Sequence, residues 1–186
     1  MTKSALILID IQDGLDTLDF YGGARNNPDA ETNCQRILEW YRERNWPIFH
    51  VKHNSTNTDS PLHPSKPGNR IKSVVAPRQA EPVIEKCVNS AFVDTDLQDQ
   101  LDKLQIKELV IVGLTTEHCV STTARMAANL GYRVQVVSDA TAAFNKVGIR
   151  GEQYDAQTIH LTTLATLKGE FAEILDTQSL LEYIRR

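Results

Sequence analysis

A cysteine, an aspartate and a lysine give this chain the chemical types that covalent catalysis needs. Cys119 lies between the apolar run 108–113 and a helix-like segment at 119–130, so its thiol is expected near a helix N-terminus, just past the carboxyl end of a strand. Free backbone N–H groups and the positive end of the helix dipole meet there. They favour the nucleophilic thiolate and can stabilise an oxyanion. The position predicts covalent cysteine catalysis, although a buried, inert cysteine is the commoner fate of a lone thiol.

Asp10 and Lys86 end two other apolar segments, at 5–9 and 83–86. In an open parallel sheet the carboxyl ends of the strands share one edge, and sites form at that edge. A carboxylate there can take the thiol proton, and an ammonium group can hold the thiolate or position the carboxylate. Taken singly, each residue is more simply a polar strand end. Their expected meeting with Cys119 at one edge is what predicts a catalytic group of three.

Strand-like and helix-like segments alternate along the chain. Short apolar runs, typical of strands covered on both faces, occur at 5–9, 47–53, 83–86, 108–113, 133–138 and 171–175. Helix patterns and capping residues occur at 29–44, 95–104, 119–130, 151–167 and 179–185. Strands separated by helices form parallel sheets with right-handed crossovers. We expect one domain over residues 1–186, an α/β fold of three α/β/α layers around a doubly wound, six-stranded parallel sheet.

Residues 54–82 break this alternation, with prolines at 61, 64, 67, 77 and 82. A loop of this length inside a compact domain is usually functional or disordered. Because it follows the second strand, we expect it at the carboxyl edge of the sheet. It is either a lid over the site or a plain surface excursion.

Composition argues against several classes of partner. The 186 residues carry a net charge of −4 without a visible basic stripe, so we do not expect nucleic-acid binding. No apolar run approaches the length of a membrane span, and the first residues lack the apolar region and cleavage site of a signal peptide. Three cysteines cannot form a complete disulfide framework. We therefore expect a cytoplasmic protein that binds a small-molecule substrate and no membrane.

Several motifs, in the same order, resemble those of the isochorismatase-like cysteine hydrolases. Residues 6–12 (LILIDIQ) are similar to the motif that carries the family aspartate, and residues 85–97 are similar to the lysine motif. Residues 113–125 (GLTTEHCVSTTAR) resemble the nucleophile motif, the most specific of the three, and residues 138–140 resemble the end of the fifth strand. The resemblance covers nearly the whole chain.

This resemblance implies a role for each of the three residues. Asp10 would be the base, Lys86 its electrostatic partner and Cys119 the nucleophile. It also implies a cis peptide bond between Leu114 and Thr115, and an oxyanion hole formed by the backbone N–H groups of Thr115 and Cys119. We expect no cofactor and a homo-oligomer, either a dimer or a tetramer.

The resemblance leaves the reaction open. Isochorismatases cleave a vinyl ether and need no cysteine nucleophile, whereas the amidase-type branch uses one. Cys119 favours an amidohydrolase that cleaves a small-molecule amide or carbamoyl C–N bond through a thioester. Vinyl-ether hydrolysis and a non-catalytic interaction protein on the same scaffold are the alternatives. The chain shows neither the glycine fingerprint of dinucleotide-binding proteins nor the nucleophile turn of serine α/β-hydrolases.

Four further residues are candidates for binding substrate. His53 comes at the carboxyl end of the second predicted strand, Phe92 follows the lysine motif, and Phe144 follows the fifth strand. Arg25, in a glycine-containing loop, is a candidate for a substrate carboxylate. Core packing is the simpler explanation of the two phenylalanines, and a surface position is the simpler explanation of the arginine.

His50, His53 and His63 suggest a metal site at first sight. Nicotinamidases of similar fold hold a metal with an Asp-x-His pair after the second strand, but residues 52–55 read KHNS here. A zinc site needs three or four ligands in register. We therefore expect no metal, with His53 in contact with substrate.

Overall fold

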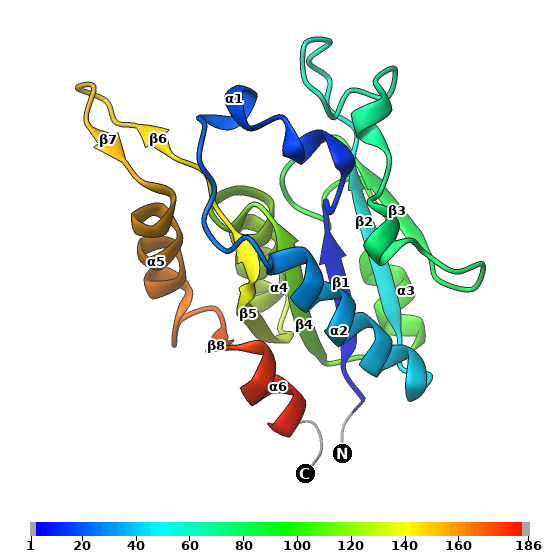
Figure 1. Cartoon of the computed structure of the whole chain (residues 1–186). Helices are drawn as coiled ribbons and strands as arrows, with labels where there is room; N and C mark the ends of the chain where they lie inside the picture. Colours follow the sequence, from blue (N-terminus) through cyan, green and yellow to red (C-terminus); the bar gives the residue numbers. More distant parts are fainter. Residues whose placement is uncertain (1–2, 184–186) are drawn as a thin grey trace.

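A computed structural model describes residues 3–183 as three layers around a central parallel sheet (Figure 1). The strands are β1 (Ala5–Ile9), β2 (Ile48–His53), β3 (Val83–Lys86), β4 (Glu108–Leu114), β5 (Arg133–Ala142) and β8 (Glu173–Leu175). Their order across the sheet is β3-β2-β1-β4-β5-β8, so the chain reverses its direction of winding between β1 and β4. Ligands bind at such a switch point in open α/β sheets. The predicted fold class is confirmed.

Helices cover both faces of this sheet. One face packs against α2 (Ala30–Glu43) and α6 (Thr177–Tyr183), and the other against α3 (Leu97–Lys103), α4 (Ser121–Asn129) and α5 (Ala156–Leu167). Strand β1 shows the physical reason. Its side chains alternate between the two core clusters, with Ile7 and Ile9 on one side and Leu6 and Leu8 on the other. Burying each large apolar side chain contributes roughly 1.5–3 kcal/mol, so β1 is held firmly just before Asp10.

The loop at 54–82 lies at the carboxyl edge of the sheet and is tied to it by hydrogen bonds. The side chain of Asn69 donates to the carbonyl oxygens of His53 (3.1 Å) and Leu62 (2.7 Å). The side chain of Gln12 donates to the carbonyl oxygens of His53 (3.0 Å) and Asn69 (2.8 Å). These bonds join the loop to the ends of β1 and β2. The loop is therefore a built wall of this edge, and two short 3-10 turns, at Pro67–Asn69 and Ser73–Val75, lie within it.

Two other segments extend over the same edge, as Figure 1 shows. They are the short helix α1 (Leu18–Tyr21) and a hairpin of β6 (Lys146–Val147) and β7 (Gln153–Tyr154). The sequence predicted a helix from 151 to 167 in place of the second hairpin strand. That helix starts at Ala156 instead, because Asp155 caps it by accepting a hydrogen bond from the Thr158 N–H at 2.6 Å.

Other predicted boundaries shift for local reasons. Strand β5 runs on to Ala142, four residues past its predicted end. Leu104, expected on the apolar face of α3, is exposed because that helix ends at Lys103. The predicted end of the last helix, at 185, lies outside the described residues. None of the helices within 3–183 combines the length and apolar character that crossing a membrane requires.

Candidate active site

Three strand ends bring Asp10, Lys86 and Cys119 into contact. The Lys86 Nζ atom lies 2.7 Å from Asp10 Oδ2 and 3.3 Å from Cys119 Sγ. All three residues are buried, with exposed fractions of 1%, 2% and 8% respectively. The group that the sequence placed at one sheet edge is therefore a contact cluster.

The backbone around Cys119 depends on a glycine. Strand β4 ends at Leu114, the peptide bond from Leu114 to Thr115 is cis, and a π-helical turn at Thr116–Val120 leads into α4. Gly113 has a φ of 116°, and a Cβ atom there would lie 2.0 Å from the Ile9 carbonyl oxygen. Only glycine fits this approach between β4 and β1. The chain can then turn and put Cys119 beside Asp10.

Lys86 uses all three of its N–H donors inside the protein. Besides Asp10 and Cys119, its Nζ atom contacts His53 Nδ1 at 3.0 Å. An ammonium group has three donors and no acceptor, so His53 Nδ1 must be the accepting nitrogen. Burial and the Lys86 charge lower the pKa of His53, which keeps the ring neutral and able to accept. His53 thus orients Lys86.

Asp10 retains one free carboxylate oxygen. Its Oδ2 atom accepts from Lys86, whereas Oδ1 is buried and has no hydrogen-bond partner within residues 3–183. A carboxylate oxygen of Asp10, a ring nitrogen of His53 and the Cys119 sulfur all lie within 4.8 Å of one another. A buried carboxylate oxygen without a donor is a good acceptor for the thiol proton.

The thiol itself is protonated in the resting site, which corrects the expectation of a thiolate at the helix N-terminus. Burial raises the pKa of Cys119 far above its usual value, and the negative charge of Asp10 raises it further. The Lys86 ammonium opposes both effects but is shared with Asp10. Desolvation disfavours a charged sulfur more than the local dipole favours it. Cys119 must therefore lose its proton during the reaction.

The same atoms have the composition of a metal site, with an acid, an imidazole and a thiol close together. The Lys86 ammonium lies 2.7 Å, 3.0 Å and 3.3 Å from the donor atoms of Asp10, His53 and Cys119. It occupies the position of a central cation. A metal ion bound by these three donors would have to displace it.

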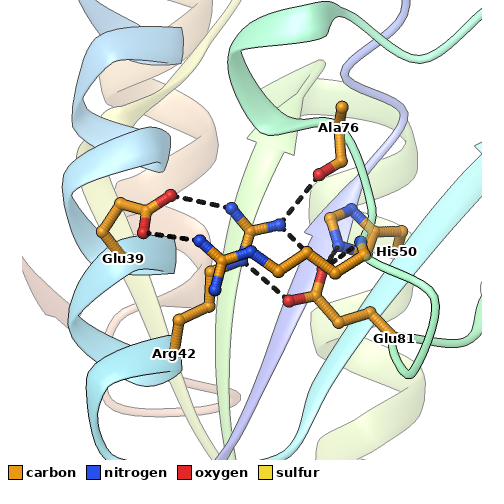
Figure 2. A network of polar contacts seen from close by, with 6 residues as sticks. Glu39, Arg42, His50, Ala76 and Glu81 are labelled. Atoms are coloured by element: carbon orange, nitrogen blue, oxygen red, sulfur yellow. Dashed lines mark hydrogen bonds and ion pairs between the residues drawn. The ribbon is translucent and has the colours of Figure 1, made fainter.

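The other histidines of the proposed set lie in separate contacts. His50 Nε2 binds Glu81 Oε2 at 2.9 Å, and Figure 2 shows this pair inside a network with Arg42. Arg42 binds both oxygens of Glu81 at 2.7 Å and 2.8 Å and also reaches α2 through Glu39. His63 Nδ1 contacts a serine hydroxyl two residues away, at 2.7 Å. His50 therefore holds the end of the loop 54–82 against β2 and α2.

A cavity of about 350 Å³ opens beside the three residues. Asp10 and Cys119 line it, and so do Thr115 and His53. Its other walls include Leu15, Tyr21, Ser60, Leu62, Asn89 and Lys146. Two larger clefts, of about 670 Å³ and 610 Å³, lie elsewhere, and neither contains a member of the catalytic group. The smaller cavity is the candidate active site because it holds the nucleophile.

The chain matches the isochorismatase domain family over residues 4–179. It belongs to the isochorismatase family. The isochorismatase family protein YrdC of Bacillus subtilis is 46% identical over 179 residues, which cover 96% of this chain and 95% of YrdC. A crystal structure of an isochorismatase-family protein from Chromobacterium violaceum has a TM-score of 0.94 at 36% identity, covering 98% and 94% of the two chains. Nicotinamidase 3 of Arabidopsis thaliana is 27% identical, covering 95% and 86%.

Some substrate-binding residues expected for this isochorismatase-family chain lie outside the cavity walls. Arg25 is not free for a substrate carboxylate, because it makes two hydrogen bonds to Glu31, at 2.7 Å and 2.8 Å. Phe92 packs on the core and stacks against Tyr132, with 5.9 Å between ring centroids. Phe144 is fully buried behind the cavity. Core packing thus accounts for both phenylalanines.

Sequence reasoning missed several walls of the cavity, among them Tyr21, Asn89 and Lys146. Asn89 follows Lys86 closely and its Oδ1 atom lies 3.7 Å from Cys119 Sγ, so its proximity to the lysine motif was a usable signal. Tyr21 and Lys146 come from α1 and the β6–β7 hairpin. No strand pattern announces these two segments, and their place over the site depends on tertiary folding.

Proposed function

We propose that this isochorismatase-family chain hydrolyses the C–N bond of a small amide or carbamoyl compound through a thioester on Cys119. The observation that carries the proposal is the buried contact of Lys86 Nζ with both the Asp10 carboxylate and the Cys119 sulfur. A thiol, a base and a fixed positive charge are the parts of an activated nucleophile. The similarity to Nicotinamidase 3, whose name is that of an amide hydrolase, supports an amide as the substrate.

In the first half of the reaction, the Cys119 thiol gives its proton to Asp10 as the sulfur bonds to the amide carbon. Lys86 stays protonated and stabilises the sulfur charge while it exists. Negative charge then moves to the former carbonyl oxygen. We assign its stabilisation to the backbone N–H groups of Thr115 and Cys119, two residues that line the cavity.

The tetrahedral intermediate collapses by breaking the C–N bond. Asp10 returns its proton to the departing nitrogen, so ammonia or an amine leaves and the thioester remains. Water then gives a proton to Asp10 and adds to the thioester carbon. The C–S bond breaks, the sulfur recovers the proton from Asp10, and the carboxylic acid departs. The buried Asp10 serves as base and acid in both halves.

The experiment that tests this proposal combines turnover with detection of the intermediate. Small amides and carbamoyl compounds are screened by ammonia release, and the best substrate is acid-quenched and examined by peptide mass spectrometry. We expect an acyl adduct on Cys119 in the wild type and neither adduct nor turnover in Cys119→Ala. A folded Cys119→Ala protein with near-normal turnover would refute the thioester.

The two alternatives have their own signatures in the same screen. Isochorismate is included, with pyruvate release as the readout. Pyruvate release that persists in Cys119→Ala would support vinyl-ether hydrolysis, with Asp10 acting as an acid. A wild-type protein that turns over none of the compounds and forms no adduct would support the non-catalytic alternative.

A further inference from the structure

We propose that the hydroxyl of Tyr21 is a substrate-recognition group that makes this cavity selective for neutral amides with a hydrogen-bond acceptor on their acyl part. The inference rests on the proposed function, because it names the substrate class of that same cavity. Tyr21 lines the cavity with Asp10 and Cys119. Its Oη atom is buried and has no hydrogen-bond partner in the described part of the chain.

A buried hydroxyl without a partner is rare in native proteins because its desolvation is not compensated. The atom faces a cavity that must hold a substrate, so an acceptor on the substrate explains its exposure to that space. Burial raises the pKa of Tyr21 to about 12, and the negative charge of Asp10 contributes to this shift. The phenol therefore keeps its proton at neutral pH and acts as a donor.

The ring of Tyr21 is held in place before any substrate binds. It stacks on the fully buried Phe144, with 5.1 Å between centroids and 24° between planes. Gly22, which follows it, has a φ of 112°, and a Cβ atom there would lie 2.3 Å from the Asn145 carbonyl oxygen. The glycine lets α1 end directly against the end of β5. A donor fixed in this way binds its acceptor without first being ordered.

The charges around the cavity argue against an anionic acyl part. Lys86 is paired with Asp10 at 2.7 Å, and the Lys146 Nζ atom lies 3.1 Å from Glu117 Oε1. Each lysine in contact with the site thus has an acidic partner already. A substrate carboxylate would have to compete with a buried or half-buried acid for either one. A neutral acceptor that pairs with Tyr21 meets no such competition.

The cavity volume sets the size of the substrate. About 350 Å³ is near the lower end of the range for small-molecule sites. Leu15, Leu62 and Leu114 contribute apolar walls. The acyl part is therefore a small, mainly apolar group with one acceptor atom directed at Tyr21.

Pairs of amides that differ in one atom or group test this selectivity. Nicotinamide and benzamide differ by a ring nitrogen, methoxyacetamide and butanamide by an ether oxygen, and succinamide and succinamate by a negative charge. We expect the wild type to prefer the acceptor-bearing and the neutral members by at least about tenfold in kcat/KM. A site built around a hydrogen bond discriminates at least this strongly.

Tyr21→Phe should remove the acceptor preference alone. Its kcat/KM should fall about tenfold or more for the acceptor-bearing amide and stay within about twofold for its partner. The matched control is Tyr154→Phe, which removes a hydroxyl from a half-exposed tyrosine outside the cavity walls and should keep the preference intact. An equal loss for both members of a pair, or an unchanged preference, would overturn the inference.

Thermal melts distinguish recognition from a structural role. Tyr21→Phe should melt within about 2 °C of the wild type, because the hydroxyl has no partner to lose. A larger fall would show that the hydroxyl is bonded inside the protein, with Ser60 of the opposite wall as the candidate acceptor, and would overturn the inference. A wild type that hydrolyses none of the amides defeats the proposed function and the inference together. Hydrolysis without acceptor preference defeats the inference alone.

Discussion

Lys86 and Asp10 form a buried ion pair, with 2.7 Å between Nζ and Oδ2, although 76 positions separate them in the chain. Both side chains are almost completely removed from solvent. Burying two charges is costly, and only close pairing and further hydrogen bonds offset that cost. His53 and Cys119 supply those further contacts to Lys86. The pair is thus a point where stability and chemistry depend on the same atoms.

Removing one charge of this pair should destabilise the protein more than removing both. Asp10→Asn or Lys86→Met alone leaves an uncompensated buried charge, and we expect each to lower the free energy of unfolding by about 3–5 kcal/mol. The double variant Asp10→Asn with Lys86→Met should recover part of that loss. Urea denaturation of the four proteins measures the coupling. Additive losses would show that the two charges do not depend on each other.

Acid should weaken the network of Figure 2 through Glu81. Burial would raise the pKa of Glu81, but hydrogen bonds from Arg42 outweigh it and hold the pKa at about 2 instead of 4.5. A depressed folded-state pKa stabilises the protein above the unfolded value, and this contribution disappears as pH falls through the folded value. The Tm difference between the wild type and Glu81→Gln should therefore be full above about pH 4.5 and shrink towards pH 2.

The control for this experiment is Glu85→Gln. Glu85 is largely exposed, and its nearest cation, Lys52, lies 3.6 Å away. Exposed pairs of this kind contribute little, so this variant should follow the wild type across the whole pH range. A Tm difference for Glu81→Gln that does not change between pH 6 and pH 2 would contradict the proposed role of ionised Glu81.

Iodoacetamide should label Cys87 before Cys119 at neutral pH. Cys87 is exposed, whereas Cys119 is buried with a raised pKa and exists mainly as the thiol. Cys34 should react last, because it is fully buried and its Sγ atom donates to the Ala140 carbonyl oxygen at 3.2 Å. Only the thiolate is the nucleophile. Peptide mapping over time gives the order.

A Cys87→Ser background isolates the second thiol. Its Cys119 labelling rate should keep rising with pH beyond pH 9, without a plateau near neutrality. Adding Asp10→Asn removes a negative charge that raises the pKa of Cys119, so labelling at a given pH should become faster. A plateau below pH 7 would mean that the helix N-terminus and Lys86 prevail and that the resting group is a thiolate.

The three catalytic candidates could be predicted from sequence because each follows a short apolar strand. Asp10 ends β1, Lys86 ends β3, and Cys119 follows β4. Alternating strands and helices make the sheet parallel, and a parallel sheet puts all three ends on one edge. The prediction needed only local patterns and one rule of topology.

Other features depend on contacts that no local pattern contains. The protonated state of Cys119 follows from burial and the charge of Asp10, whereas the sequence showed only the helix start. Tyr21 reaches the cavity because α1 folds over the end of β5 and stacks on Phe144. Lys146 does so from a hairpin whose two strands have two residues each, too short for a periodic signal.

Exhaustive chelation should leave the activity unchanged. The donor atoms of Asp10, His53 and Cys119 surround Lys86 Nζ, which already provides a positive charge to all three. Turnover of the best amide before and after dialysis against EDTA, with zinc and iron measured by elemental analysis, checks this. Loss of activity on chelation and recovery with one metal would show that Lys86 leaves this position in the working enzyme.

The final prediction concerns how the catalytic losses combine. Cys119→Ala and Asp10→Asn should each lower kcat by several orders of magnitude, because the sulfur forms the bond and Asp10 moves its proton in the same step. Residues that act as a unit show strongly non-additive effects. The double variant should therefore be scarcely slower than Cys119→Ala alone. Cys119→Ala should stay folded, since losing one sulfur at a cavity wall costs on the order of 1 kcal/mol. Melts of all three variants accompany the kinetics, and fully additive losses in folded proteins would mean that Asp10 acts independently of the thiol.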